Sequence, residues 1–262
     1  MKTEILSKLK KEFKNYNSAL VAFSGGIDST LLLFLLKKIL GNNVKAATVV
    51  FPYIPSKDIE KTKTLAKLIG VQHHLFDGSN IFKNKNFRLN PRNRCYICKK
   101  HIYEVLKRFA EKEKISVIVD GTNFDDLKED RPGLKALEEE NIKTPLADLG
   151  LDKKTVRLLA KQFNLPNWNS PPTTCLLTRL PFGTEITADK LSRIEKAESF
   201  LASVLGEPNI AIRVRDYMDI AVLEVSKDYI SKVFLEKAQI LKKFKELGFK
   251  KVALDLEGYY RF

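Results

Sequence analysis

SALVAFSGGIDSTLLLFLLKKIL, residues 18–40, joins two apolar runs through a turn that contains two adjacent glycines. The pattern predicts a buried strand over residues 18–23 and a helix over residues 29–40, which Gly41 ends. Glycines let a backbone approach an anion closely, and the N–H groups at the start of a helix attract negative charge. The turn between the strand and the helix therefore predicts a phosphate-binding site.

The turn itself, SGGIDST at residues 24–30, differs from the loop with which P-loop enzymes bind the terminal phosphate of ATP. That loop has the pattern GxxxxGK[ST], whereas this turn has no lysine and carries Asp28 within it. An enzyme that transfers the γ-phosphoryl group is therefore disfavoured.

Strand and helix patterns alternate through residues 1–165. Further strands are expected at residues 44–51, 71–76 and 115–120, and further helices at residues 56–69, 97–113 and 153–163. Continuous apolar strands separated by helices predict a parallel sheet that is covered on both faces. Ligands of such sheets bind beyond the carboxyl ends of the strands, which is where the SGGIDST turn and Gly121 lie.

A proline-rich segment predicts the boundary between two domains. Residues 165–175, LPNWNSPPTTC, contain three prolines and cannot form a helix. We therefore expect an α/β domain at residues 1–165, a hinge at residues 166–186 and a smaller α+β domain at residues 187–262. The predicted order of elements in the second domain is helix, strand, strand, helix and strand.

The composition is that of a globular protein with a basic surface. The chain has 262 residues, 44% of them hydrophobic, and a formal net charge of +14 from 46 basic and 32 acidic side chains. No apolar run approaches the roughly 20 residues that a bilayer crossing needs, and the N-terminal MKTEILSKLKKEF lacks a signal-peptide core. We therefore expect a cytoplasmic protein that does not enter membranes and that binds an anionic partner.

Three cysteines form a second constellation. Cys95 and Cys98 lie in a basic stretch, residues 83–108, where nine Lys and Arg side chains accompany a single acid, and Cys175 lies in the expected hinge. Basic surroundings favour thiolates, and three thiolates suit a soft metal. The residues leave two sites open: an iron–sulfur cluster with one iron free of protein ligands, or a zinc site that His101 completes.

Residues 24–30 resemble the SGGxDS loop of the α/β ATP pyrophosphatases, which include asparagine and GMP synthetases and the tRNA thiolases. The resemblance implies cleavage of ATP between its α and β phosphates, with an adenylated substrate as the intermediate. It assigns Asp28 to Mg²⁺, which neutralises charge on the departing pyrophosphate. The residues expected to bind ATP are Ser24, Gly25, Gly26, Asp28, Ser29, Thr30 and Gly121.

Longer segments carry a closer resemblance, which covers nearly the whole chain. GTNFDDLKEDRPGLKALEE at residues 121–139, SPPTTCLLTRLPFGTEIT at residues 170–187 and IRVRDYMDIAVLEV at residues 212–225 are similar to the LarE family of ATP-dependent sulfur transferases. Members adenylate a carboxylate of a pyridinium dicarboxylate mononucleotide and replace oxygen by sulfur, which makes the precursor of the nickel-pincer nucleotide. The family is hexameric, so the resemblance also implies a homo-oligomer.

The same resemblance implies roles for particular residues. Some members give up the sulfur of one cysteine, at the position of Cys175, whereas members with an additional CxxC bind a [4Fe–4S] cluster through three cysteines. Cys95, Cys98 and Cys175 make this chain similar to the cluster type, in which an extra sulfide on the free iron attacks the adenylate. Asp28 and Cys175 are thus the expected catalytic residues, and sulfide or another donor is the expected sulfur source. The expected ligands of the mononucleotide phosphate are Thr178, Arg179, Arg213, Arg215 and Arg261.

Two other functions fit parts of the same pattern. A tRNA thiolase shares the loop and a three-cysteine cluster, and a net charge of +14 suits a polyanion. No RNA-binding module is recognisable, however, so a small anionic nucleotide is the expected partner rather than a nucleic acid. A non-enzymatic zinc or cluster protein that only binds nucleotide would tolerate the loss of Asp28, whereas both enzymes would not.

Overall fold

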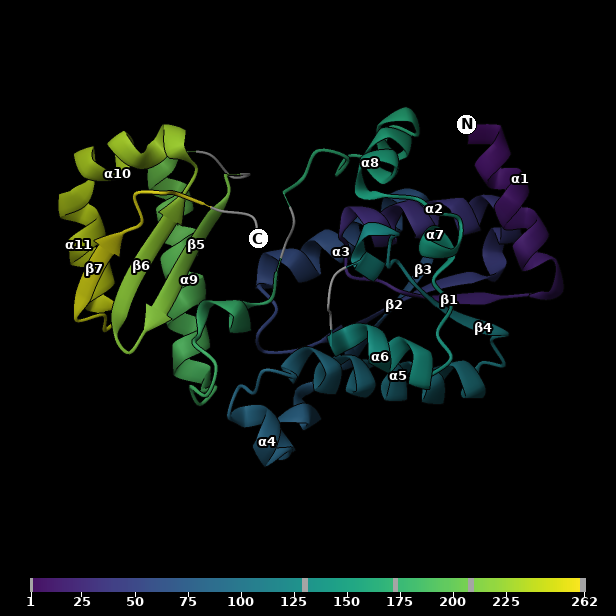
Figure 1. Cartoon of the computed structure of the whole chain (residues 1–262), viewed down its shortest axis with the longest axis horizontal. Coiled ribbons are helices and arrows are strands. Elements are labelled where there is room, and N and C mark those ends of the chain that lie inside the picture. The colour runs from purple at the N-terminus through teal and green to yellow at the C-terminus, as the bar shows by residue number, and fades with distance from the viewer. Residues whose placement is uncertain (1, 129–131, 172–173, 207–209, 260–262) are drawn as a thin grey trace. The chain divides into compact units, whose positions relative to one another are not determined.

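A computed structural model describes residues 2–128, 132–171, 174–206 and 210–259 of the chain (Figure 1). Its contacts divide the chain into two units, each with its own sheet and its own hydrophobic core. The first unit consists of Met1–Lys83 and Asn93–Ser170, and the second of Asn84–Arg92 and Pro171–Phe262.

The first unit is built on a four-stranded sheet. Its strands are β1 (Ala19–Ala22), β2 (Val44–Val50), β3 (Gln72–Asp77) and β4 (Val117–Asp120). They lie in the order β3-β2-β1-β4 and all neighbours are parallel, which confirms the predicted α/β class. The chain moves outward from β1 to β3 and then returns to the other side of β1, so the carboxyl ends of β1 and β4 flank the point where the order reverses.

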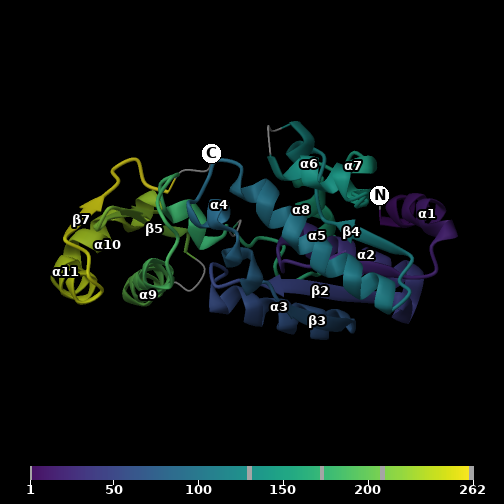
Figure 2. The ribbon, with the colours of Figure 1, turned by 90° about the horizontal axis from the view of Figure 1, so that it is seen from below.

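Helices cover both faces of this sheet. They are α1 (Lys2–Glu12), α2 (Ile27–Leu40), α3 (Ser56–Ile69), α5 (Arg94–Lys112), α6 (Pro132–Glu139), α7 (Pro145–Asp148) and α8 (Lys153–Gln162). Figure 1 shows α2 on one face and α5 on the other, and in Figure 2 the same unit is seen from the side of α5. Ala19, Leu20 and Val21 of β1 are completely buried as a result, with Val21 in the core beside α2 and Leu20 pointing to the opposite face.

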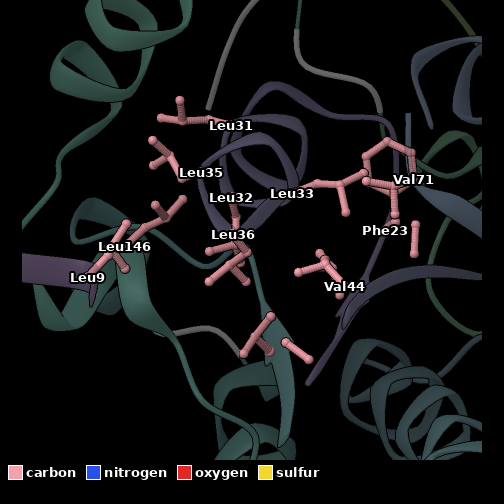
Figure 3. Close-up of a cluster of buried hydrophobic side chains, with 14 of the residues drawn as sticks. Leu9, Phe23, Leu31, Leu32, Leu33, Leu35, Leu36, Val44, Val71 and Leu146 are labelled. Carbon is pink, nitrogen blue, oxygen red and sulfur yellow. The ribbon is translucent and has the colours of Figure 1, made fainter. Parts of the chain in front are cut away.

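The leucines of α2 fill the centre of the first core. Five of them are completely buried because the helix lies between the sheet and the helices α1, α7 and α8. Figure 3 shows them radiating from α2 toward side chains of several other segments. The labelled side chains are Leu31, Leu32, Leu33, Leu35 and Leu36 of α2, with Leu9, Phe23, Val44, Val71 and Leu146 around them. The α2 N-terminus, and with it the glycine turn, is thereby anchored by the core.

The second unit confirms the predicted α+β order. A mixed sheet has the order β5-β6-β7, in which β5 and β6 are antiparallel and β6 and β7 are parallel. The core between the sheet and the helices includes Leu201, Val214, Leu223 and Phe244. The elements are α4 (Lys85–Arg88), α9 (Ala188–Leu205), β5 (Ile212–Tyr217), β6 (Ile220–Val225), α10 (Ile230–Leu235), α11 (Lys237–Glu246) and β7 (Lys251–Leu254).

Contacts group two segments differently from the sequence-based domain scheme. That scheme kept residues 84–92 in the first domain and set residues 166–186 apart as a hinge. Asn90 ties the short segment to the second unit, because its Nδ2 donates to the carbonyl of Pro181 at 2.9 Å and its own carbonyl accepts from Gly183 N at 3.1 Å. Prolines and glycines indicate a domain boundary in the sequence, but they do not predict hydrogen bonds between segments that are far apart in the chain.

The helix ends follow ordinary capping chemistry. Oδ1 of Asp152 accepts from Thr155 N at 2.7 Å at the start of α8, and Oγ1 of Thr187 accepts from Lys190 N at 3.3 Å at the start of α9. Gly70 ends α3 in the left-handed conformation, with φ of 72°. Within the described ranges, no helix has the length and apolar character to cross a membrane.

Candidate functional site

The turn between β1 and α2 is fixed by its own hydroxyl groups. Oγ1 and N of Thr30 donate to the carbonyl of Gly26 at 2.7 and 3.0 Å, and Ser29 Oγ donates to the same carbonyl at 3.2 Å. Gly25 has a φ of +70°, a conformation that L side chains rarely adopt. Ser29 and Thr30 are buried whereas Ser24 is exposed. The backbone therefore holds the curved shape of an anion-binding turn before any ligand arrives.

Asn167, which sequence analysis passed over, supports this turn from behind. Its Nδ2 donates to the carbonyl of Gly25 at 3.2 Å and to Thr30 Oγ1 at 3.0 Å. The side chain is 3% exposed, and its Oδ1 has no hydrogen-bond partner among the described residues. Arg157 of α8 holds the following residues in place by donating to the carbonyl of Trp168 at 3.0 Å. The segment that the prolines mark as a boundary thus also shapes the glycine turn.

Asp28 occupies the first turn of α2, and burial raises the pKa of its carboxyl group above the ordinary value. Asn123 opposes this rise by donating from Nδ2 to Asp28 Oδ1 at 2.9 Å, while the charge of Asp126 adds to it. A partly buried carboxylate with a raised pKa is stabilised in its charged form by a cation beside it. The oxygen chemistry of Asp28 therefore fits Mg²⁺, which prefers such hard ligands.

Asn123 reaches Asp28 because β4 lies next to β1 in the sheet. A tight loop holds it there: Asn123 N donates to Asp126 Oδ2 at 3.1 Å, and Asp126 N donates back to Asn123 Oδ1 at 3.1 Å. Lys153 at the start of α8 lies 3.4 Å from Asp126 Oδ1. The sequence pattern of this GTNFDD segment indicates no role for its side chains, whereas the structure shows that the segment orients Asn123 toward Asp28.

Gly121 follows β4 and lies directly against the start of α2. A Cβ atom at this position would be 2.7 Å from Ser29 N and 2.8 Å from Ser29 Cα, so only glycine fits without a backbone shift. Its expected contact with ATP stays a prediction. The structure gives Gly121 a role in bringing the ends of β1 and β4 together.

Asp120, the last residue of β4, joins the sheet to α5. Burial would raise the pKa of its carboxyl, but Lys99 at 2.9 Å and hydrogen bonds from Thr122, Lys99 and Tyr103 outweigh burial and hold the pKa below its usual value. Tyr103 donates to Asp120 Oδ2 at 2.8 Å and accepts from Lys99 Nζ at 3.0 Å. In the sequence, Lys99 is one of several cations of a basic stretch, and its spacing does not reveal that Asp120 is its partner.

Cys95 and Cys98 lie in the first two turns of α5. A separation of three residues puts both side chains on the same side of the helix. Cys95 is exposed, whereas Cys98 is partly buried with its Sγ 3.1 Å from the hydroxyl of Tyr53. None of the three cysteines, all of which are described, forms a disulfide.

His101, the residue that would complete a zinc site, lies one turn beyond Cys98 on α5. Its ring packs against Phe51 with a centroid distance of 6.0 Å, and its Nε2 is buried with no partner among the described residues. Across the described ranges, no group of three or more His, Cys, Asp and Glu side chains is arranged to hold a metal ion. Cys95 and Cys98 belong to the first unit and Cys175 to the second.

Cys175 precedes a short 3-10 helix, η5 (Leu176–Arg179), and its backbone is tightly held. Its carbonyl accepts from Thr178 N at 3.1 Å, from Thr178 Oγ1 at 3.0 Å and from a terminal nitrogen of Arg179 at 3.3 Å. These bonds fix the position of Cys175 within the second unit.

Arg179 is buried, with 6% of its surface exposed, and serves the structure of this segment. Its guanidinium forms a fork on Glu198 of α9 at 2.8 and 3.2 Å and also donates to Thr174 Oγ1 at 2.6 Å. Val214 N also donates a hydrogen bond to Oε1 of Glu198, at 3.0 Å. Because Nε and both terminal nitrogens are engaged, the guanidinium is fixed in this arrangement.

The other predicted phosphate ligands differ in their partners. Arg215 pairs with Glu224 on the neighbouring strand and donates to the carbonyl of Thr178 at 3.1 Å. Arg213 stacks on the ring of Tyr259 at 4.7 Å and forms no ion pair with any described residue. Arg261 lies outside the described residues. Arg213 is thus the member of the described set with a guanidinium that no carboxylate occupies.

Comparisons with known proteins agree with this geometry. A family model described as a PP-loop domain matches residues 1–131, half of the chain. An uncharacterised protein of Methanocaldococcus jannaschii is 42% identical over 98% of this chain and 96% of its own, and one of Synechocystis is 36% identical over 97% and 94%. The pyridinium-3,5-bisthiocarboxylic acid mononucleotide synthase of Lactiplantibacillus plantarum is 32% identical over 94% of this chain and 88% of its own. The chain therefore belongs to the LarE family of ATP-dependent sulfur transferases, within the PP-loop enzymes.

Proposed function

We propose that this protein uses ATP to transfer sulfur to a carboxylate of pyridinium-3,5-dicarboxylic acid mononucleotide, in the synthesis of the nickel-pincer nucleotide. The observation that carries the proposal is the extent of the likeness to the pyridinium-3,5-bisthiocarboxylic acid mononucleotide synthase, which spans 94% of the chain. A PP-loop alone would indicate only the use of ATP, since it covers half of the chain. The longer likeness includes the second unit and its Cys175 segment.

In the first step, the glycine turn binds the pyrophosphate portion of ATP. A carboxylate oxygen of the substrate attacks the α-phosphorus, the bond from that phosphorus to the bridging oxygen breaks, and pyrophosphate leaves. Asp28, held by Asn123, provides the oxygen ligand for Mg²⁺ that offsets the charge on the leaving group. The amides at the start of α2 lower the energy of the same charge.

In the second step, sulfur replaces AMP at the acyl carbon. The donor set fits a [4Fe–4S] cluster, because three thiols are available and two of them lie on one side of α5. Cys95, Cys98 and Cys175 would hold the cluster, which when bound supplies a sulfide on the iron that lacks a protein ligand. The hydrogen bonds from Thr178 and Arg179 to the Cys175 carbonyl keep that ligand's backbone in place.

On the substrate side, we assign the mononucleotide phosphate mainly to Arg213. Its stacking on Tyr259 leaves the guanidinium donors available, whereas the pairing of Arg179 and Arg215 with buried glutamates fixes those two side chains. Arg179 and Arg215 then act by positioning Thr178, whose hydroxyl and carbonyl they contact.

The test is a single-turnover reaction under anaerobic conditions with reconstituted protein, ATP, Mg²⁺, sulfide and the dicarboxylate mononucleotide. We expect AMP, pyrophosphate and a product in which sulfur replaces one oxygen, and about four irons per chain. The Cys175→Ala variant should still release pyrophosphate but form no thiocarboxylate. ADP and phosphate as the main products would contradict the proposal, and stoichiometric zinc without iron would contradict the cluster. Thiolation of added unmodified tRNA would move the assignment to a tRNA thiolase.

A further inference from the structure

Tyr53 follows β2 and contacts the sulfur of Cys98 from a different part of the first unit. Its side chain is 1% exposed, and its hydroxyl lies 3.1 Å from Cys98 Sγ. The ring stacks on Phe51 at 4.8 Å with an interplanar angle of 11° and meets Phe82 edge-on at 5.9 Å. Packing on two sides fixes the direction in which the hydroxyl points, so this contact does not depend on a mobile surface rotamer.

Tyr103 is a second tyrosine near Cys98, but its hydroxyl is already committed. It donates its single hydrogen to Asp120 Oδ2 at 2.8 Å and accepts from Lys99 Nζ at 3.0 Å. Tyr53 therefore differs from Tyr103 in directing its hydroxyl at the sulfur. Once Cys98 is a thiolate it has no hydrogen to give, and Tyr53 must be the donor.

We propose that Tyr53 donates a hydrogen bond to the thiolate of Cys98 when that cysteine ligates the cluster, and that this bond raises the cluster's reduction potential. The inference rests on the proposed function, because it requires the cluster. A donor to a ligand sulfur withdraws negative charge from it, which stabilises the more negative reduced state. Tyr53 is thus a positioning residue that touches the ligand and not the substrate.

The experiment compares wild-type protein with Tyr53→Phe after anaerobic reconstitution. Phenylalanine keeps the ring that packs on Phe51 and removes only the hydroxyl. We expect the equilibrium constant for cluster reduction to fall about tenfold, which is 59 mV for a one-electron couple. The midpoint is read from a redox titration followed by electron paramagnetic resonance, at matched iron content. Tyr16→Phe is the control, since the ring of Tyr16 packs on Phe13 in the same unit.

A second variant reverses the direction of the effect. Site-specific 3-fluorotyrosine at position 53 makes the hydroxyl a stronger donor, so the potential should rise instead of fall. An unchanged potential in either variant with a full cluster would overturn the role of Tyr53 and leave the proposed function intact. Absence of iron from the wild-type protein would refute both. If Tyr53→Phe fails to fold, the fluorinated protein alone decides, because its shape is almost unchanged.

Discussion

The turn after β1 and the segment around Cys175 are both held by many hydrogen bonds, but they differ in whether their charged side chains form ion pairs. In the first, Asp28 is partly buried, forms no ion pair with any described residue, and has a pKa that burial raises. In the second, Arg179 and Glu198 are more deeply buried than Asp28, and they form an ion pair with each other at 2.8 Å. A site that must accept a charged ligand keeps an uncompensated charge, whereas a segment that must hold a shape pairs its charges internally.

The difference separates residues that bind from residues that position. Removing a group with unused capacity costs binding but little stability, because no buried partner is left alone. Removing one member of a buried pair leaves the other charge without compensation and costs stability first. This contrast orders the expected effects of substitution in the two regions.

The largest effect is expected from Asp28→Asn. The amide keeps the size of the side chain but cannot neutralise Mg²⁺, so AMP formation should fall by at least about a thousandfold. The free energy of unfolding at neutral pH should stay the same or rise, because the amide avoids the desolvation that raises the pKa of Asp28. Product analysis and chemical denaturation measure the two quantities.

Asp189→Asn in the first turn of α9 is the matched control, since it changes an acid at another helix start. It should alter neither quantity by much. A large loss of stability in Asp28→Asn would show that Asp28 is a structural residue and would remove the contrast between the regions.

The next largest effect is a difference in stability loss between substitutions of two arginines in the second unit. Arg179→Ala should lower the free energy of unfolding by about 3–5 kcal/mol, because it leaves Glu198 buried without a cation. Arg213→Ala should cost less than about 1 kcal/mol, since it removes only a partly exposed stacking contact and leaves no buried charge without a partner. It should nevertheless raise the KM for the mononucleotide about tenfold while ATP binding stays unchanged.

Far-UV circular dichroism in denaturant measures the stabilities, because the single tryptophan, Trp168, belongs to the first unit. Equal losses of stability in the two variants would contradict the distinction between a positioning and a binding arginine. A stable Arg179→Ala protein with a raised KM for the mononucleotide would indicate that Arg179 binds the phosphate.

A smaller effect is expected where the two strands meet behind the glycine turn. Gly121→Ala places a Cβ 2.7 Å from Ser29 N, so the backbone at the start of α2 must shift at a cost of about 1–3 kcal/mol. ATP affinity should fall with it. Gly133→Ala on α6 is the matched control, because its nearest contact is an ordinary 3.5 Å to Lys99 and alanine favours a helix. Calorimetric melting and nucleotide titration of both variants distinguish local strain from a general intolerance of alanine.

Local patterns predicted most of the fold, because strand, turn and cap signals act over a few residues. The turn at residues 24–30 and the helix expected at residues 153–163 are confirmed in this way. Partners distant in sequence were not predictable: Asn123 meets Asp28 across 95 residues and Asn167 meets Gly25 across 142. The same limit explains the arginines. A guanidinium near a cysteine indicates anion binding, but only the tertiary structure reveals that Glu198 is the anion Arg179 contacts.

The smallest expected effect is on stability in acid, where groups of the two units change the free energy of unfolding in different pH ranges. Burial lowers the pKa of His73 on β3 from 6.5 to about 4, and its Nε2 lies 2.8 Å from Thr48 Oγ1. Between pH 6.5 and 4, His73 is protonated in the unfolded chain but stays neutral in the folded chain. The contribution of His73 to the free energy of unfolding is therefore fully present above about pH 6.5 and decreases as the pH falls toward 4.

In the second unit, Arg193 holds the pKa of Asp219 below its usual 3.8, and that contribution is lost only as the pH falls further. His73→Gln should therefore flatten the decline between pH 6.5 and 4, whereas Asp219→Asn should lower stability above pH 3.8 and flatten the decline below it. Denaturation midpoints measured at half-unit steps of pH test both slopes. An unchanged slope in His73→Gln would mean that another group of the first unit takes up the proton.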